Sequence, residues 1–193
     1  MAAPPSPERP AQRADARRNQ ENLLEAAARA FVDSGVDVPV RDIAARAGVG
    51  LGTIYRHFPT RADLIVAVYR HQVEACAAAG PALLQECGSP VVALTRWLDL
   101  FVDFLVTKRG LAEALNSDDA ALAPLHEFFV ERLVPVCGDL LSAASAAGEL
   151  RRDVGAYQLL RSIGNLCIGG EQDPRYAPRS AVEMMLAGLR EPG

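Results

Sequence analysis

Hydroxyl, imidazole and guanidinium groups gather in one short stretch of the sequence, at Thr53, Tyr55, Arg56 and His57. Tyrosine and histidine side chains donate hydrogen bonds to phosphate oxygens, and a threonine offers both a hydroxyl and a methyl group that can meet a thymine methyl. Gly52 has no side chain, so DNA can approach the backbone closely there. The chemistry open to this stretch includes contact with DNA, in which Tyr55 and His57 would donate to the phosphates.

Two further arginines flank this stretch, at Arg41 and Arg61. Arg41 can reach guanine N7 and O6 in a bidentate pair, which would carry sequence information. Arg61 can add positive charge near the start of the following helix, where anions are attracted. Arg56 suits a base or a phosphate equally. Two other interpretations stay open, in which Tyr55 is half-buried against the first helix and His57 only caps a helix or fills a gap.

The elements that must position these groups are short helices. Val40, Ile43, Ala44 and Ala47 give a helix one apolar face, and Gly48 can end it. A glycine-rich link of four or five residues follows. A second short helix is expected to start near Thr53 and to bury Ile54 and Phe58, leaving the polar side chains on its other face. This spacing predicts a helix-turn-helix.

Helical periodicity continues on both sides of this unit, and no segment shows sustained alternation of apolar and polar residues. Before it, a helix is expected from Ala16 to a stop at Gly35. After it, helices are expected at about residues 61–78, 91–106, 124–147, 154–167 and 178–190. The fold class predicted is therefore all-α, with about nine helices.

The run VRDIAARAGVGLGTIYRHFPTRADL, preceded by the helix end AAARAFVDSG, resembles the DNA-binding signature of the TetR family of bacterial transcriptional regulators. The resemblance covers the N-terminal third of the chain. It implies a three-helix DNA-binding domain and a C-terminal helical domain for ligand binding and dimerisation. The implied function is that of a repressor, which binds a palindromic double-stranded DNA operator as a homodimer and is released by a small-molecule effector of unknown identity.

The sequence departs from the family's pattern at Arg56, a position that is often aromatic in the family, and at two further places. Gly50 and Leu51 stand where members of the family often have Ser and Lys, and Val38 and Pro39 replace a threonine-rich helix start. We therefore expect the polar cap of that helix to be missing and the list of DNA contacts to be shorter than is usual. A helical adaptor or ligand-binding protein that has lost specific DNA binding is the alternative that these departures leave open.

Charge and proline content divide the chain into three parts: a flexible arm over 1–14, the DNA-binding domain over 15–75 and a regulatory domain over 76–193. Residues 1–75 hold ten arginines against nine acidic residues, a net charge of about +1, whereas 76–193 hold ten basic and fifteen acidic residues, about −5. The acidic part is expected to avoid DNA. Whether the arginines of the arm touch DNA is left open.

Ligand-binding and dimer-forming residues are predicted within the regulatory part. The candidates for a ligand pocket between residues 75 and 141 are aromatic or polar: Trp97, Phe101, Phe104, Asn116, His126 and Phe129. The candidates for a dimer interface are apolar residues of the last two helices: Leu159, Leu160, Ile163, Leu166, Met184, Met185 and Leu189. In both sets the alternative is packing within one subunit.

Other classes of function lack support in the sequence. There is no GxSxG, P-loop or HExxH motif, so no enzyme and no cofactor are expected. The four cysteines lie far apart without a CxxC pair, which favours buried thiols over a metal site. No apolar run approaches the roughly 20 residues that cross a bilayer, and the N-terminus lacks the apolar core of a signal peptide. A cytoplasmic protein without membrane contact is expected.

Overall fold

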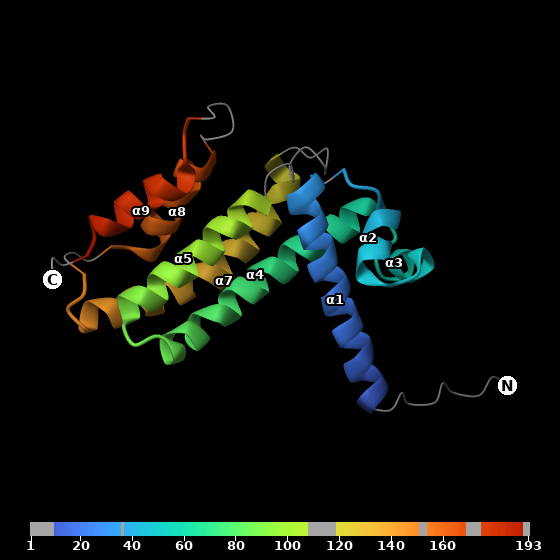
Figure 1. Ribbon diagram of the computed structural model, residues 1–193, viewed down its shortest axis with the longest axis horizontal. Helices are drawn as coiled ribbons and strands as arrows, with labels where there is room; N and C mark the ends of the chain where they lie inside the picture. Colours follow the sequence, from blue (N-terminus) through green and yellow to red (C-terminus); the bar gives the residue numbers. More distant parts are fainter. Residues whose placement is uncertain (1–9, 36, 108–118, 151–153, 169–174, 191–193) are drawn as a thin grey trace. The chain divides into compact units, whose positions relative to one another are not determined.

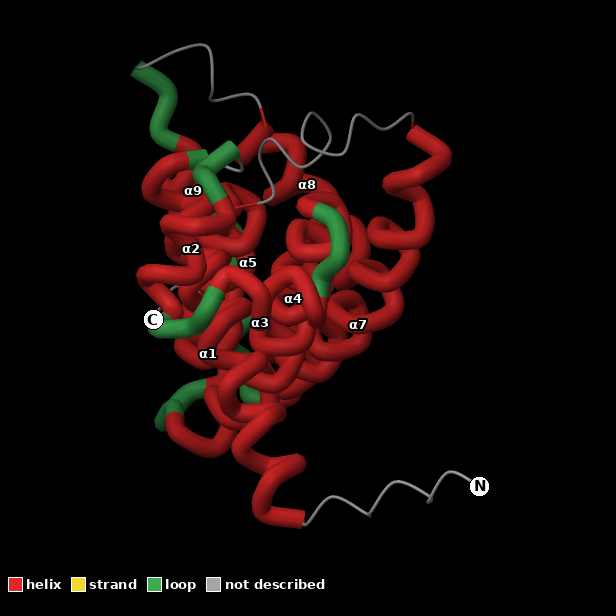
Figure 2. Tube along the Cα trace, turned by 90° about the vertical axis from the view of Figure 1, so that its right-hand side faces the viewer, coloured by secondary structure: helices red, strands yellow, loops and turns green. Residues whose placement is uncertain are grey.

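The computed structural model describes residues 10–35, 37–107, 119–150, 154–168 and 175–190. These residues form eight α-helices and no strand, as Figure 2 shows along the chain trace. The prediction of an all-α fold is confirmed, with eight helices in the described ranges against the nine or so expected. The helices are α1 (Pro10–Ser34), α2 (Val40–Ala47), α3 (Leu51–His57), α4 (Arg61–Glu86), α5 (Pro90–Thr107), α7 (Asp119–Ala146), α8 (Ala156–Ile168) and α9 (Pro178–Ala187) (Figure 1).

The chain forms two compact units, Met1–His71 and Gln72–Gly193, so that α4 contributes residues to both. The division falls after residue 71, a little before the boundary after residue 75 that the sequence suggested. In the first unit α2 packs on α1 and on α3. The core of this unit consists of buried apolar side chains from all its helices and from the link between α1 and α2, among them Leu23, Ala27, Phe31, Val38, Ile43, Ile54, Phe58 and Leu64.

In the second unit α5 packs against α7 and α8, and α8 packs against α9. The centre is aromatic: the Trp97 and Phe101 rings of α5 stack with centroids 6.2 Å apart, and Phe101 lies 5.7 Å from Phe129 of α7. Ion pairs join Arg132 of α7 to Glu74 of α4, and Arg179 of α9 to Asp103 of α5.

The turn after α7 closes this unit at one end. Gly148 has φ +72°, a left-handed conformation that ends α7. Its neighbour Glu149 then accepts a 2.7 Å hydrogen bond from the Val91 amide at the start of α5. Arg190, just beyond α9, donates a 2.7 Å hydrogen bond to the Thr95 hydroxyl of α5. These two hydrogen bonds hold the residues that follow α7 and α9 to the first turns of α5.

The largest differences from the predicted helix bounds, five residues or more, are in three helices. α1 begins at Pro10, inside the expected arm, since proline is pre-set for a first helical residue. α7 begins at Asp119 and contains Pro124, which was predicted as its start. α4 continues beyond Ala78 through Pro81 to Glu86, because packing around Gly80 outweighs the local preference for a break.

Gly80 is buried where α4 meets its neighbours. A β-carbon placed there would overlap the Val136 side chain and lie 3.6 Å from the Trp97 indole nitrogen. That nitrogen donates a 2.8 Å hydrogen bond to the Cys76 carbonyl, one turn earlier in α4. Glycine therefore allows α5 and α7 to approach α4 closely.

Within the described residues, no helix is long and apolar enough to cross a membrane.

Candidate nucleic-acid interface

The turn between α2 and α3 is built on Gly48. This residue has φ +67°, and its amide donates to the Ala45 carbonyl at 3.3 Å while the Val49 amide donates to the Ala44 carbonyl at 3.0 Å. This double hydrogen bond is the Schellman motif, in which glycine takes the left-handed position after the last turn of a helix. It ends α2 as predicted and lets α3 begin at Leu51, two residues earlier than the predicted start.

α2 is held against α1 and begins without a polar cap. Ile43 and Ala44 are buried, and Arg46 pairs with Asp33 of α1 at 2.8 Å. Pro39 occupies the cap position, and no side chain caps the first turn. The prediction that this cap is missing is therefore confirmed. The backbone amides of that turn remain without a side-chain acceptor.

α3 separates into a buried face and an open face. Ile54 and Phe58 are buried, as the spacing predicted, and the Phe58 amide donates to the Ile54 carbonyl at 2.8 Å to end the helix. Tyr55 is 48% exposed, Arg56 and His57 are also exposed, and Thr53 is half-buried.

The open face is also free of obstruction at Gly52. A β-carbon added to this residue would meet no atom within 4 Å. The backbone of α3 is thus accessible beside Thr53, as close approach of DNA requires. The structure brings Gly52, Thr53, Tyr55, Arg56 and His57 together on one seven-residue helix.

Arg41 and Arg61 lie in different surroundings. The Arg41 side chain is 79% exposed on α2 and forms a 3.2 Å surface ion pair with the adjacent Asp42. Such a pair is weak and can be exchanged for another acceptor. Arg61 is half-buried and donates a 2.9 Å hydrogen bond to the Val38 carbonyl, which joins the start of α4 to the link between α1 and α2.

The start of α4 carries a motif that the sequence reasoning missed. The Thr60 amide and hydroxyl both donate to the Asp63 carboxylate, at 2.9 and 2.7 Å, and the Asp63 amide donates to the Thr60 hydroxyl at 3.1 Å. This is a capping box, whose sequence signal is a threonine followed three residues later by an acid. It fixes the point where the chain leaves α3 and enters α4.

Comparisons with known proteins agree with this architecture. The family model "Bacterial regulatory proteins, tetR family" matches residues 23–68, and the model "Transcriptional regulator SbtR-like, C-terminal domain" matches 89–191, more than half of the chain. The chain belongs to the TetR family of bacterial transcriptional regulators. The resemblance carried by the helix-turn-helix sequence is thus confirmed, and the family is one of DNA-binding regulators.

Similarity to individual relatives extends over most of the chain of this TetR regulator. A TetR transcriptional regulator from Streptomyces coelicolor is 33% identical, with 90% of this chain and 99% of that chain covered and a TM-score of 0.75. A TetR regulator from Mycobacterium vanbaalenii is 35% identical, with 93% and 99% covered and a TM-score of 0.68. An HTH-type transcriptional regulator from Staphylococcus aureus is 24% identical over 132 residues, which cover 68% of this chain and 71% of the relative.

The residues predicted to bind a ligand occupy different environments in this TetR regulator. Trp97, Phe101, Phe104 and Phe129 are buried and contact one another through their rings, whereas His126 is exposed and stacks on Phe129 at 5.9 Å. Asn116 lies outside the described residues. The rings thus form a packed core, and a ligand between α5 and α7 would have to separate them.

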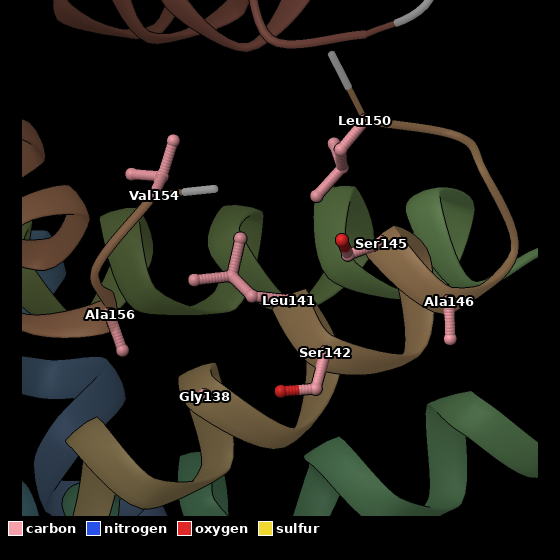
Figure 3. A pocket seen from close by; sticks show the side chains of 8 residues that line it. All are labelled: Gly138, Leu141, Ser142, Ser145, Ala146, Leu150, Val154 and Ala156. Carbon is pink, nitrogen blue, oxygen red and sulfur yellow. The ribbon is translucent and has the colours of Figure 1, made fainter. Parts of the chain in front are cut away.

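A surface cavity of the regulator lies at the carboxyl-terminal end of α7. It has a volume of about 480 Å³ and is shown in Figure 3. Its lining comes from α7, the following link and the start of α8: Gly138, Leu141, Ser142, Ser145, Ala146, Leu150, Val154 and Ala156. Of the predicted ligand residues that the structure describes, Trp97, Phe101, Phe104, His126 and Phe129, none lines this cavity.

The residues predicted to form a dimer interface divide into two groups. Leu159, Leu160 and Ile163 are buried within their own unit, where they hold α8 in place. Leu166, Met185 and Leu189 are half-buried, and Met184 is 70% exposed. A surface groove of about 610 Å³ runs between α8 and α9, lined by Ser162, Asn165, Leu166, Ala181, Met184 and Met185.

Proposed function

We propose that this TetR regulator is a repressor that binds a palindromic operator as a homodimer and releases it when a small, mostly apolar molecule binds. The observation that carries the proposal is the open face of α3. Tyr55, Arg56 and His57 are exposed there, while Ile54 and Phe58 anchor the helix in the core. A helix held in this way can enter the major groove, with the tyrosine and histidine on phosphates.

Dimerisation is proposed because one helix-turn-helix contacts too few base pairs to be specific, and two-fold symmetry doubles the site. The apolar groove between α8 and α9 supports this part of the proposal, since it exposes Met184 and leaves Leu166 and Met185 accessible. Exposed apolar surface of this kind is a common feature of protein interfaces.

Release by a ligand is proposed to act through α4, whose residues belong to both units. A ligand among the helices between residues 75 and 141 would change the distance between the two recognition helices. Half-sites lie about 34–36 Å apart, so a change of several ångströms prevents both from being read. A coupling of about 1–3 kcal/mol between ligand and operator is ordinary for such a mechanism.

The experiment is selection of bound sequences from random DNA by the full chain, followed by salt titration on the selected site. A palindromic consensus is expected, with log Kd rising against log salt by roughly 0.9 for each phosphate contact. A helical adaptor without specific DNA binding would select no consensus. Sequence selection without a palindrome would contradict the homodimer and leave DNA recognition standing.

A further inference from the structure

Two large apolar side chains are exposed on the short helix α3. Leu51 is 43% exposed and Tyr55 is 48% exposed. They are four residues apart, so they lie on the same face of the helix. In the described part of the first unit, the other large apolar residue with such exposure is Val32 of α1. On a helix proposed to contact DNA, such an apolar pair is stabilised by contact with an apolar group of the DNA.

The residues on either side of Leu51 are both glycines. A β-carbon on Gly50 would come no nearer than 3.9 Å to a neighbouring atom, the Thr53 hydroxyl oxygen, and one on Gly52 would meet nothing within 4 Å. The leucine side chain therefore projects between two bare backbone positions. A surface that accommodates this side chain can close against the helix on both sides of it without steric hindrance.

The chemistry of the major groove offers one matching group. Base edges there present hydrogen-bond donors and acceptors, and the C5-methyl of thymine is their apolar feature. Leu51 carries no hydrogen-bonding group in its side chain, so it gains nothing from the donors and acceptors. Contact with a methyl group, in contrast, removes apolar surface of both partners from water.

We propose that Leu51 is a specificity-determining residue, which packs against a thymine methyl and so selects an A·T pair at one position of each operator half-site. This inference rests on the proposed operator binding and names the chemistry that Leu51 reads. Tyr55 continues the apolar face by one turn, while its hydroxyl remains available to a phosphate. The readout at Leu51 is then one of shape and apolar contact.

The test replaces thymine by uracil, which pairs identically and lacks only the methyl group. The selected operator is synthesised with deoxyuridine at each thymine in turn, in one half-site and then in both. At one position of the half-site, the full-length protein should lose affinity about fourfold when the methyl group is removed from one half-site. The loss should be about sixteenfold when it is removed from both. Leu51→Ala should bind the thymine and uracil operators equally, because its side chain no longer reaches the methyl.

Two variants serve as controls. Leu51→Met keeps an apolar side chain of similar reach, so the difference between thymine and uracil should persist. Val32→Ala truncates the other exposed apolar side chain of the first unit and should leave that difference unchanged. Circular dichroism of each variant establishes that the helices are retained.

The proposal is overturned if no thymine position responds to uracil, or if Leu51→Ala responds as strongly as the unaltered protein. In either case a selected consensus would still support operator binding, so the two proposals fail separately. If Leu51 instead contacts another protein, Leu51→Ala should retain the full uracil effect while operator affinity stays unchanged. Absence of any selected consensus would overturn both proposals.

Discussion

At the scale of single residues, Arg41 and Arg61 show how one side-chain type takes different roles in different surroundings. Arg41 is solvent-exposed and paired only weakly with its neighbour Asp42, so its guanidinium is available to an incoming base. Arg61 satisfies a carbonyl that is 23 residues away in sequence, at Val38. The first arrangement suits recognition and the second stabilises the fold, although Arg61 can still add positive charge.

Substitution of these two arginines should separate the two roles. Arg41→Ala should leave the free energy of unfolding within about 0.5 kcal/mol of the original value, and should relax discrimination at one operator position by about 1–3 kcal/mol if it pairs with guanine. Arg61→Ala should lower the free energy of unfolding by about 1–3 kcal/mol, because the part-buried Val38 carbonyl loses its donor. Urea denaturation and operator titration measure the two effects. Equal loss on operator and random DNA would assign Arg41 to the backbone.

The buried thiols give the stability of the protein a dependence on alkaline pH. Burial raises the pKa of Cys76 and of Cys137 from the ordinary 9.0 to about 12, and for Cys137 the nearby Cys76 contributes as well. Between these values an unfolded thiol loses its proton while a folded one keeps it. Stability is therefore unaffected by these groups below pH 9 and falls above it, by about 1.4 kcal/mol per pH unit for each thiol.

Urea denaturation at pH 8, 9.5 and 10.5 measures this fall. Burial also raises the pKa of Tyr69, which adds a loss of the same sign. Cys137→Ala should reduce the slope, because it removes one of the two thiols whose pKa burial raises. A thiol reagent should also modify Cys87 before the three buried cysteines. An unchanged slope in Cys137→Ala would contradict the assignment.

At the scale of elements, Gly80 determines how closely α4 can pack in the second unit. Gly80→Ala adds a methyl group that meets Val136 and Trp97. Such overpacking costs about 1–3 kcal/mol, more than the roughly 1 kcal/mol that alanine gains over glycine in a helix. We expect lower stability. Gly138→Ala in α7 is the matched control, since its β-carbon meets only Ala156 at 3.9 Å, and it should be neutral or stabilising.

Denaturation midpoints of the two variants decide this prediction. If Gly80→Ala proved as stable as Gly138→Ala, α4 would be able to move away from α7 at little cost. The continuation of α4 through Pro81 would then need another explanation. Near-ultraviolet circular dichroism of Trp97 provides a second measurement, because its indole nitrogen lies beside the added methyl group.

Sequence patterns predicted some elements better than others, for physical reasons. The helix-turn-helix was predictable because Gly48, Ile54 and Phe58 act locally, through a backbone conformation and a helical period. The course of α4 past Ala78 was not, because a glycine and a proline normally end a helix and only tertiary packing reverses that preference.

The candidate site divides in the same way. Exposure of Tyr55 and His57 follows from the buried period of α3, so sequence sufficed to predict it. The hydrogen bond from Arg61 to Val38 depends on the folded arrangement of the first unit and has no sequence signal. Leu51 appeared only as a departure from the family pattern, and its exposure between two open glycine positions required the structure.

At the scale of the whole molecule, helical periodicity in α8 and α9 did not distinguish core from surface. Ile163 and Met184 both fit an apolar helical pattern, yet Ile163 is fully buried within its unit and Met184 is 70% exposed. A pair of helices that buries some of its apolar residues and exposes others has two contact surfaces, one inside its unit and one open. The exposed surface is the part on which the proposed homodimer would depend.

The last prediction tests that dependence. Met184→Glu places a charge in the groove between α8 and α9. Because two-fold symmetry brings the same groove of both subunits to one interface, the substitution introduces two charges that burial would desolvate. We expect a monomeric mass in sedimentation at micromolar concentration, with unchanged helix content. Operator binding should weaken, since each monomer reads only one half-site.

Leu100→Glu is the control, because Leu100 is similarly apolar and 42% exposed but lies on α5. It should remain dimeric and bind the operator normally. A dimeric mass for Met184→Glu would show that the interface lies outside the groove between α8 and α9. A monomeric mass for the unaltered chain would exclude a stable homodimer at that concentration.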